Sequence, residues 1–310
     1  MKRDAFTLVE VVVVIVLFGI IATIGANIIA KMYMNYMQAR TVNYLQTQSS
    51  ITLEQISRRL QYRIKDTIVA RKTADNPDTV LYLGNSGVGN DFNVIEWIGY
   101  SNEALRAGKT PGWSGFIDLD NASTSRTDKT IVTLGSNLVL AENIISALSN
   151  NKVNLSVTGN ETALIFKGKR TNNQNIDYGW DGNGGNPQYM LKVTRDNTRN
   201  NVFKVADFPA ETITMYEQYY LAHSAYAIVP VNERITGIDF DLELRYNYRP
   251  WTIGGTYDHA NTQRALLATQ VNLFRIKQVG NTIRIKLCLH DGNKSGFDNY
   301  IAACKEEVVL

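Results

Sequence analysis

The sequence has few of the residues on which many enzymes rely. It contains 3 histidines and 2 cysteines among 310 residues. His223, His259 and His290 are widely spaced and form no HExxH pattern, and no GxSxG, P-loop or dinucleotide motif occurs. Two distant cysteines without a neighbouring metal-ligand pattern do not make a zinc site. We therefore predict that this chain is not an enzyme and that it needs no cofactor.

An excess of one charge is also lacking. The chain has 32 Lys and Arg residues against 29 Asp and Glu residues, for a net charge of +3. This excess is too small to indicate nucleic-acid binding by itself, so a nucleic-acid partner stays open. A composition with 44% hydrophobic and 20% charged residues is typical of globular protein with an added anchor. Its length suits one large domain or two modest ones.

Proline is absent before Pro77, and charge is nearly absent from Phe6 to Ala30. At about 1.5 Å per residue, this apolar stretch can cross a hydrocarbon core of about 30 Å as a helix. Only five residues precede it, and no small-residue cleavage site follows, which excludes an ordinary secretory signal. Its one charge, Glu10, costs about 2.5 kcal/mol near a bilayer centre and therefore indicates a functional partner.

The beginning of the chain resembles the type III signal of prepilins, a family that comprises type IV pilins and the pseudopilins of type II secretion systems. The resemblance rests on Lys2-Arg3, then Ala5, then the run FTLVE from Phe6 to Glu10. It implies that a prepilin peptidase cuts between Ala5 and Phe6 and methylates the new amine. It also implies that Glu10 neutralises the amine of a neighbouring subunit and sets the register between staggered helices, since a buried ion pair specifies geometry.

Two positions depart from the family pattern. Ala5 stands where glycine is usual before the cut, and Asn27 stands where many major pilins have a proline. Gly19 and Gly25 are then the positions at which the helix can loosen. This pattern suits a minor pilin or pseudopilin better than a major subunit. The motif covers only about the first tenth of the chain.

Residues 31–72 are predicted to continue this helix as an amphipathic segment. Apolar residues recur there at spacings of three and four, with charged residues largely between them. The apolar positions are Leu53, Ile56, Leu60, Ile64 and Ile68. We expect one rod of roughly 100 Å from Phe6 to about Lys72, which ends before Pro77.

Residues 73–310 are predicted to form a β-rich domain with long loops. Predicted strands are Thr79–Leu83, Asn93–Tyr100, Thr130–Leu134, Thr162–Phe166, Tyr189–Val193, Ile213–Ala222, Ala225–Val231, Gly237–Tyr248, Val271–Lys277 and Thr282–His290. Asn102–Ala107 and Ala141–Leu148 are predicted helices. The expected fold class is α+β, with the long helix packed on an antiparallel sheet. In the last predicted strand, the alternate residues Ile283 to Leu289 should face the helix.

The two cysteines, Cys288 and Cys304, are predicted to form a disulfide. In an oxidising compartment it would close a short loop and stabilise the fold by about 3 kcal/mol. Pilins often carry a disulfide in their C-terminal loop, so the resemblance supports the pairing. Two free thiols are the alternative.

A calcium site is a weaker prediction. Asp291, Asn293 and Ser295 provide oxygen ligands at alternate positions, as in the first half of a calcium loop. The twelfth position is Ala302, where such a loop needs a bidentate glutamate. Asp177–Asn186 is a second loop rich in oxygen ligands. Plain turns are the alternative for both loops.

Aromatic residues gather in several short segments. They include Trp97, Tyr100, Trp113, Phe116, Tyr216, Tyr219, Tyr220, Tyr246, Tyr248 and Trp251. Most are expected to be core or cross-strand partners. A minority could serve subunit contacts or hold a sugar or single-stranded DNA.

Together these features predict a minor pilin or minor pseudopilin that initiates or caps a periplasmic filament. Its domains would be a leader (1–5), a transmembrane assembly helix (6–30), an amphipathic continuation (31–72) and a periplasmic domain (73–310). The resemblance implies as partners other major and minor pilins or pseudopilins, the prepilin peptidase and an inner-membrane assembly platform. The chain would cross the inner membrane once before it enters a pilus, pseudopilus or DNA-uptake filament. The alternative is a membrane-anchored periplasmic binding module with an aromatic ligand surface.

Overall fold

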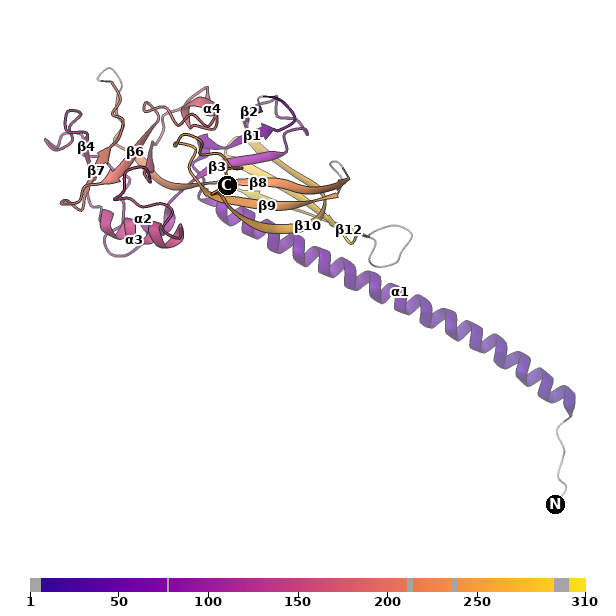
Figure 1. The fold of residues 1–310 in the computed structure, drawn as a ribbon. Coiled ribbons are helices and arrows are strands. Elements are labelled where there is room, and N and C mark those ends of the chain that lie inside the picture. The colour runs from indigo at the N-terminus through magenta and orange to yellow at the C-terminus, as the bar shows by residue number, and fades with distance from the viewer. Residues whose placement is uncertain (1–6, 77, 211–213, 236–238, 293–300) are drawn as a thin grey trace.

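The computed structural model describes residues 7–76, 78–210, 214–235, 239–292 and 301–310. One long helix, α1 (Leu8–Gln61), extends from a β-rich body, and most of its length stands clear of that body (Figure 1). Thr7 caps the helix, because its hydroxyl accepts the backbone N–H of Glu10 while the Glu10 carboxylate accepts the N–H of Thr7. This reciprocal arrangement is a capping box.

The predicted continuation of the helix to Lys72 is wrong, because α1 ends at Gln61. The N–H of Ile64 donates to the carbonyl of Ile98 at 2.8 Å, and Arg63 forms a bridge with Gly99. Pairing with a distant strand therefore replaces the next helical turn. The guanidinium of Arg63 also donates to the carbonyl of Leu60, which satisfies a backbone acceptor at the helix end. With 54 residues, α1 is about 80 Å long rather than 100 Å.

The described strands belong to one 12-stranded sheet, and the pairings between them are antiparallel. The strands are β1 (Val69–Lys72), β2 (Thr79–Tyr82), β3 (Val94–Tyr100), β4 (Thr130–Val132), β5 (Thr162–Phe166), β6 (Met190–Arg195), β7 (Val202–Val205), β8 (Tyr219–Ile235), β9 (Asp239–Tyr248), β10 (Gln263–Val279), β11 (Thr282–His290) and β12 (Ala302–Val309). The shorter helices are η1 (Lys65–Thr67), α2 (Asn102–Leu105), α3 (Leu138–Leu148) and α4 (Gln174–Asp177). The sheet runs β12-β11-β10-β9-β8-β5-β6-β7-β4, and β3, β1 and β2 branch from β8. The α+β fold class is thereby confirmed.

Strand β8 connects the two halves of the body. It pairs with β5 through Tyr219–Ala222, with β3 through Ala222–Ile228 and with β9 through Ala225–Ile235. The sequence indicated two neighbouring strands here, Ile213–Ala222 and Ala225–Val231, but β8 is continuous across His223 and Ser224. Pairing with β3 extends through this point and holds the chain extended.

The first half, which we call the proximal lobe, comprises the C-terminal part of α1 and strands β9 to β12. Leu53, Ile56 and Leu60 of α1 are buried in one cluster with the alternate residues of β11. Those β11 residues are Ile283, Ile285, Leu287 and Leu289. The prediction that this face meets the helix is confirmed, although β12 follows β11 as the edge strand and was not predicted.

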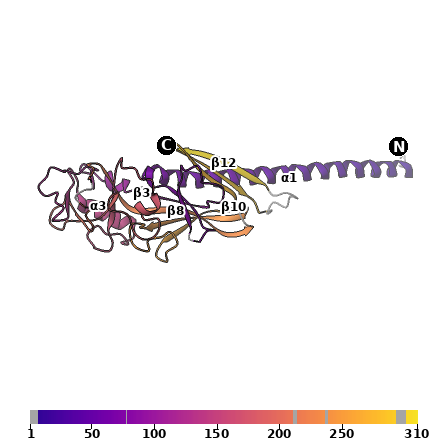
Figure 2. The same ribbon diagram turned by 90° about the horizontal axis from the view of Figure 1, so that it is seen from above.

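The second half, the distal lobe, comprises α2, α3 and strands β4 to β7. Its core includes Ile131, Leu138, Ile145 and Phe203, and it also takes in Tyr219 and Leu221 at the start of β8. Asn137 caps α3 by accepting the N–H of Leu140 at 3.2 Å. Both views place the distal lobe beyond the C-terminal end of α1, on the side away from the N-terminus (Figures 1 and 2).

Candidate functional site

The first half of α1 is apolar, and none of the residues that the structure describes covers it. By length and composition α1 can cross a membrane. Its most apolar stretch of 18 residues has a mean hydropathy of 2.8, and none of that stretch is buried. Large apolar side chains from Leu8 to Ile29 are exposed around the helix. Such a surface requires lipid or other apolar helices as its environment. The helix is therefore consistent with membrane anchoring.

Glu10 lies at the exposed start of this helix. Its Oε2 atom accepts the N–H of Thr7 at 3.4 Å and the hydroxyl of Thr7 at 3.3 Å. A carboxylate can accept about four hydrogen bonds, so these two leave capacity for a further donor. Ala5 and Phe6, the residues of the predicted cut, lie outside the described residues. Cleavage, methylation and the register role of Glu10 stay predictions.

Gly19 and Gly25 lie in unbroken helix. A Cβ atom at either position would meet no neighbouring atom within 4 Å. Packing within this chain therefore does not require glycine at either position. Their predicted role in helix flexibility stays a prediction.

The predicted disulfide is present. Cys288 of β11 and Cys304 of β12 are directly paired in the strand register, with 4.0 Å between their Cα atoms. The bond joins the edge strand to its neighbour. It therefore fixes β12, which packs along α1, where Lys305 donates to the hydroxyl of Ser50 at 2.5 Å.

The calcium predictions gain no geometric support. Asn293 and Ser295 lie outside the described residues, and the Asp291 carboxylate accepts the N–H of Ile301 at 3.1 Å. In the second loop, Asp177 accepts hydrogen bonds from Thr171 and Asn186. Within the described ranges, no group of three or more His, Cys, Asp or Glu side chains could hold a metal ion.

Most of the aromatic residues belong to the core, as expected. Trp97, Trp113 and Trp251 are buried, whereas Phe116 and Tyr216 are exposed. Several other tyrosines are only partly buried because they line a cavity. That cavity could not be recognised from the aromatic segments alone.

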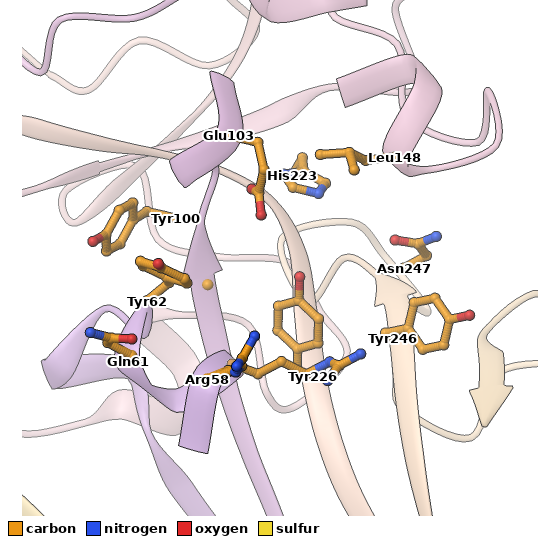
Figure 3. Close-up of a pocket in the computed structure, with 12 residues that line it drawn as sticks. Arg58, Gln61, Tyr62, Tyr100, Glu103, Leu148, His223, Tyr226, Tyr246 and Asn247 are labelled. Atoms are coloured by element: carbon orange, nitrogen blue, oxygen red, sulfur yellow. The ribbon is translucent and has the colours of Figure 1, made fainter. Parts of the chain in front are cut away.

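This cavity, the junction pocket, lies between the end of α1, strand β3 and the two lobes. It has a volume of about 550 Å³ and is drawn in Figure 3. It is lined by Arg58, Arg59, Gln61, Tyr62, Gly99, Tyr100, Glu103, Leu148, His223, Tyr226, Tyr246 and Asn247. Glu103 and Leu148 come from the distal lobe, whereas Tyr246 and Asn247 come from β9. A position between two lobes is common for small-molecule sites.

Tyr226 is held in place by its neighbours on β3. Its ring stacks on Trp97, with the ring centroids 5.7 Å apart and the planes inclined by 21°. A Cβ atom at position 99 would lie 2.7 Å from Cε2 of Tyr226, so Gly99 leaves the space that this ring occupies. Tyr62 meets Tyr100 edge to face at 5.8 Å across the pocket wall.

His223 is the buried polar residue of the junction pocket. It is 5% exposed, and its Nδ1 atom has no hydrogen-bond partner among the residues that the structure describes. Burial lowers the pKa of His223 to about 4, so the imidazole is neutral at pH 7. No local pattern marks His223 for this role, because an isolated histidine is more often a core residue and the other lining residues come from distant segments.

Comparison with known proteins adds a family match at the N-terminus. Residues 1–26 match the family model described as the prokaryotic N-terminal methylation motif. The match supports a pilin-like or pseudopilin-like subunit that assembles with other pilins and is processed by a prepilin peptidase. The family that carries this motif is structural rather than enzymatic. Neither the curated proteins nor the solved structures gave a match.

Proposed function

We propose that this chain is a minor pilin or minor pseudopilin that initiates or caps a periplasmic filament. The observation that carries the proposal is the methylation motif at the start of an apolar helical segment, residues 8–30, whose side chains are exposed and whose one charged residue is Glu10. Cleavage before Phe6 would create a charged amine at the edge of this apolar surface. Neutralisation by the Glu10 carboxylate of a neighbouring subunit would then fix the stagger between helices.

The position of the distal lobe supports a place at the filament end. This lobe extends past the end of α1, away from the half that would enter the membrane (Figures 1 and 2). Helices stacked side by side with an axial stagger place the body of the next subunit in that direction. In a repeating subunit, a lobe there would obstruct the neighbouring subunit, whereas the subunit at the filament end has no neighbour on that side.

The location of the chain follows from the same proposal. Before assembly, α1 would span the inner membrane once and the body would lie in the periplasm. After assembly, the chain would be part of a pilus, pseudopilus or DNA-uptake filament. The partners would be other major and minor subunits, contacted through α1, and the inner-membrane assembly platform.

Mass spectrometry of the N-terminal peptide tests this proposal. The chain should be purified from membranes of its native host, in which the prepilin peptidase is active. We expect a peptide that starts at a methylated Phe6. An intact Met1 would contradict the proposal and favour a plain membrane anchor that carries a binding module.

A further inference from the structure

We propose that the junction pocket binds a neutral saccharide. This inference concerns a site about which the methylation motif says nothing, and it does not depend on the filament role. The pocket volume of about 550 Å³ lies within the range of about 300–1,000 Å³ that is typical of small-molecule sites.

The first observation is that aromatic rings form the walls of the pocket before any ligand enters. The ring of Tyr226 stacks on Trp97 and occupies the space that Gly99 leaves free. The ring of Tyr62 contacts Tyr100 edge to face. Figure 3 shows Tyr226 between the Tyr62 and Tyr100 side and the Tyr246 side of the pocket. Flat rings with polar hydroxyl groups offer an apolar face and a hydrogen-bonding edge. The C–H face of a sugar ring can stack on the apolar face of a tyrosine, and the sugar hydroxyl groups can bond to the tyrosine hydroxyl groups.

The second observation is that the charges around the pocket nearly cancel. Arg58 is paired with Glu54 at 2.5 Å, which leaves Arg59 and Glu103 as opposite charges at the rim. Glu103 lies on the side opposite Arg58 (Figure 3). Glu103 disfavours an anionic ligand, and the arginines disfavour a cationic one. A neutral polyol can donate to the carboxylate and accept from the guanidinium groups at the same time.

The third observation is the buried His223 imidazole, which lines the pocket and whose covered Nδ1 atom has no hydrogen-bond partner among the described residues. Burial of a polar ring is costly, so a ligand that bonds to the part of the imidazole that faces the pocket gains binding energy. A hydroxyl group can either donate or accept, and therefore suits both neutral tautomers of the imidazole. A purely aromatic ligand would fill the space between the tyrosines and offer the imidazole no such bond. The combination of stacking faces, mixed donors and acceptors, and a neutral buried histidine points to a sugar.

The test is direct binding by the full chain in phosphatidylcholine nanodiscs, which avoids sugar-based detergents. We would screen an array of neutral and acidic oligosaccharides and then titrate maltotriose, cellotriose and chitotriose by calorimetry, with sialyllactose as the acidic counterpart. We expect saturable binding of at least one neutral oligosaccharide at millimolar concentration or below. No binding to any neutral glycan overturns the proposal, as does binding restricted to acidic glycans.

Substitutions then locate the binding. Tyr62→Ala removes a wall and Glu103→Gln weakens an acceptor at an exposed position, so each should reduce affinity by about tenfold or more. Tyr216→Ala and Glu217→Gln are matched controls, because both residues are exposed and lie outside the pocket. Circular dichroism establishes that each variant folds. Equal affinity in all four variants would place the binding elsewhere and overturn the assignment to this pocket.

Discussion

Glu10 has two possible roles that an alanine substitution removes together. Its carboxylate belongs to the capping box of α1, and the proposed filament uses its negative charge against a neighbouring amine. A glutamine can still accept the N–H of Thr7, since glutamine also serves in capping boxes, but it carries no charge. The pair of substitutions Glu10→Gln and Glu10→Ala therefore separates the local role from the intermolecular one.

We predict that both substitutions reduce incorporation into filaments by about tenfold or more, because each leaves the neighbouring amine unpaired. Membrane insertion should be unchanged, since loss of a charge makes the apolar segment easier to insert. The measurement is the amount of each variant in sheared filaments relative to the membrane fraction. Normal incorporation of Glu10→Gln alongside a defective Glu10→Ala would show that the cap, rather than the charge, is essential.

His223 predicts a particular dependence of stability on pH. Burial lowers its pKa from 6.5 to about 4, so between these values the unfolded chain binds a proton that the folded chain does not. Stability therefore rises with pH across this window and is lost as the pH falls. From pH 7 to pH 5, this residue should reduce the free energy of unfolding by about 2 kcal/mol.

Denaturant unfolding at pH 7 and pH 5 checks this value, with His223→Gln as the comparison. The variant should lose about 2 kcal/mol less than the wild type between the two pH values. The other ionisable groups are common to both proteins, so their contributions cancel in the comparison. Equal losses in the two proteins would mean that His223 is already accessible to protons in the folded state.

At the scale of elements, the edge strand β12 owes its position to covalent and helical contacts. Among the described strands it pairs with β11 alone, is joined to it by the Cys288–Cys304 bond, and packs along α1. Replacing both cysteines by serine should lower the free energy of unfolding by about 3 kcal/mol, because the unfolded chain regains the freedom of the closed loop.

Chemical unfolding of the double variant, compared with the oxidised and reduced wild type, measures this effect. Reduction of the wild type should reproduce most of the loss, which controls for the serine side chains. An unchanged unfolding midpoint in both cases would show that pairing with β11 and contacts with α1 hold β12 without the disulfide.

Elements whose residues alternate or recur regularly were predictable from the sequence. Strand β11 has its predicted bounds, and β3 and β5 agree to within a residue. The end of α1 was not predictable, because Arg63 and Ile64 stop the helix by pairing with the distant residues Ile98 and Gly99. Strand β12 escaped prediction because the charged residues around Lys305 interrupt its apolar alternation.

The functional residues also divide into those that a local sequence pattern predicts and those that distant contacts bring together. The N-terminal motif is contiguous, so the sequence alone indicates its chemistry. The junction pocket draws on α1, β3, α2, α3, β8 and β9, and none of its residues forms a local pattern. Its buried histidine and its oriented tyrosines are consequences of tertiary packing, which local periodicity does not encode.

At the scale of the whole molecule, the start of α1 and the distal lobe lie at opposite ends of the long dimension (Figure 2). The exposed apolar half of α1 offers a surface for neighbouring helices, while the distal lobe and the junction pocket lie at or beyond the other end of the helix. In an assembled filament this arrangement would point the pocket away from the membrane. A saccharide site placed there would be accessible from outside the filament end.

The proposed placement at the filament end predicts that each filament holds few copies of this chain, whatever the length of the filament. Gold labelling of a tag fused to the chain should mark one end of each filament and leave the shaft unlabelled. Quantitative mass spectrometry of sheared filaments should give a ratio to the most abundant subunit that falls as filaments lengthen, because an end is present once whatever the length. An equally tagged major subunit is the control and should label the whole shaft. Regular labelling of the shaft by this chain would show that the distal lobe can be accommodated between successive subunits, and the capping role would then be wrong.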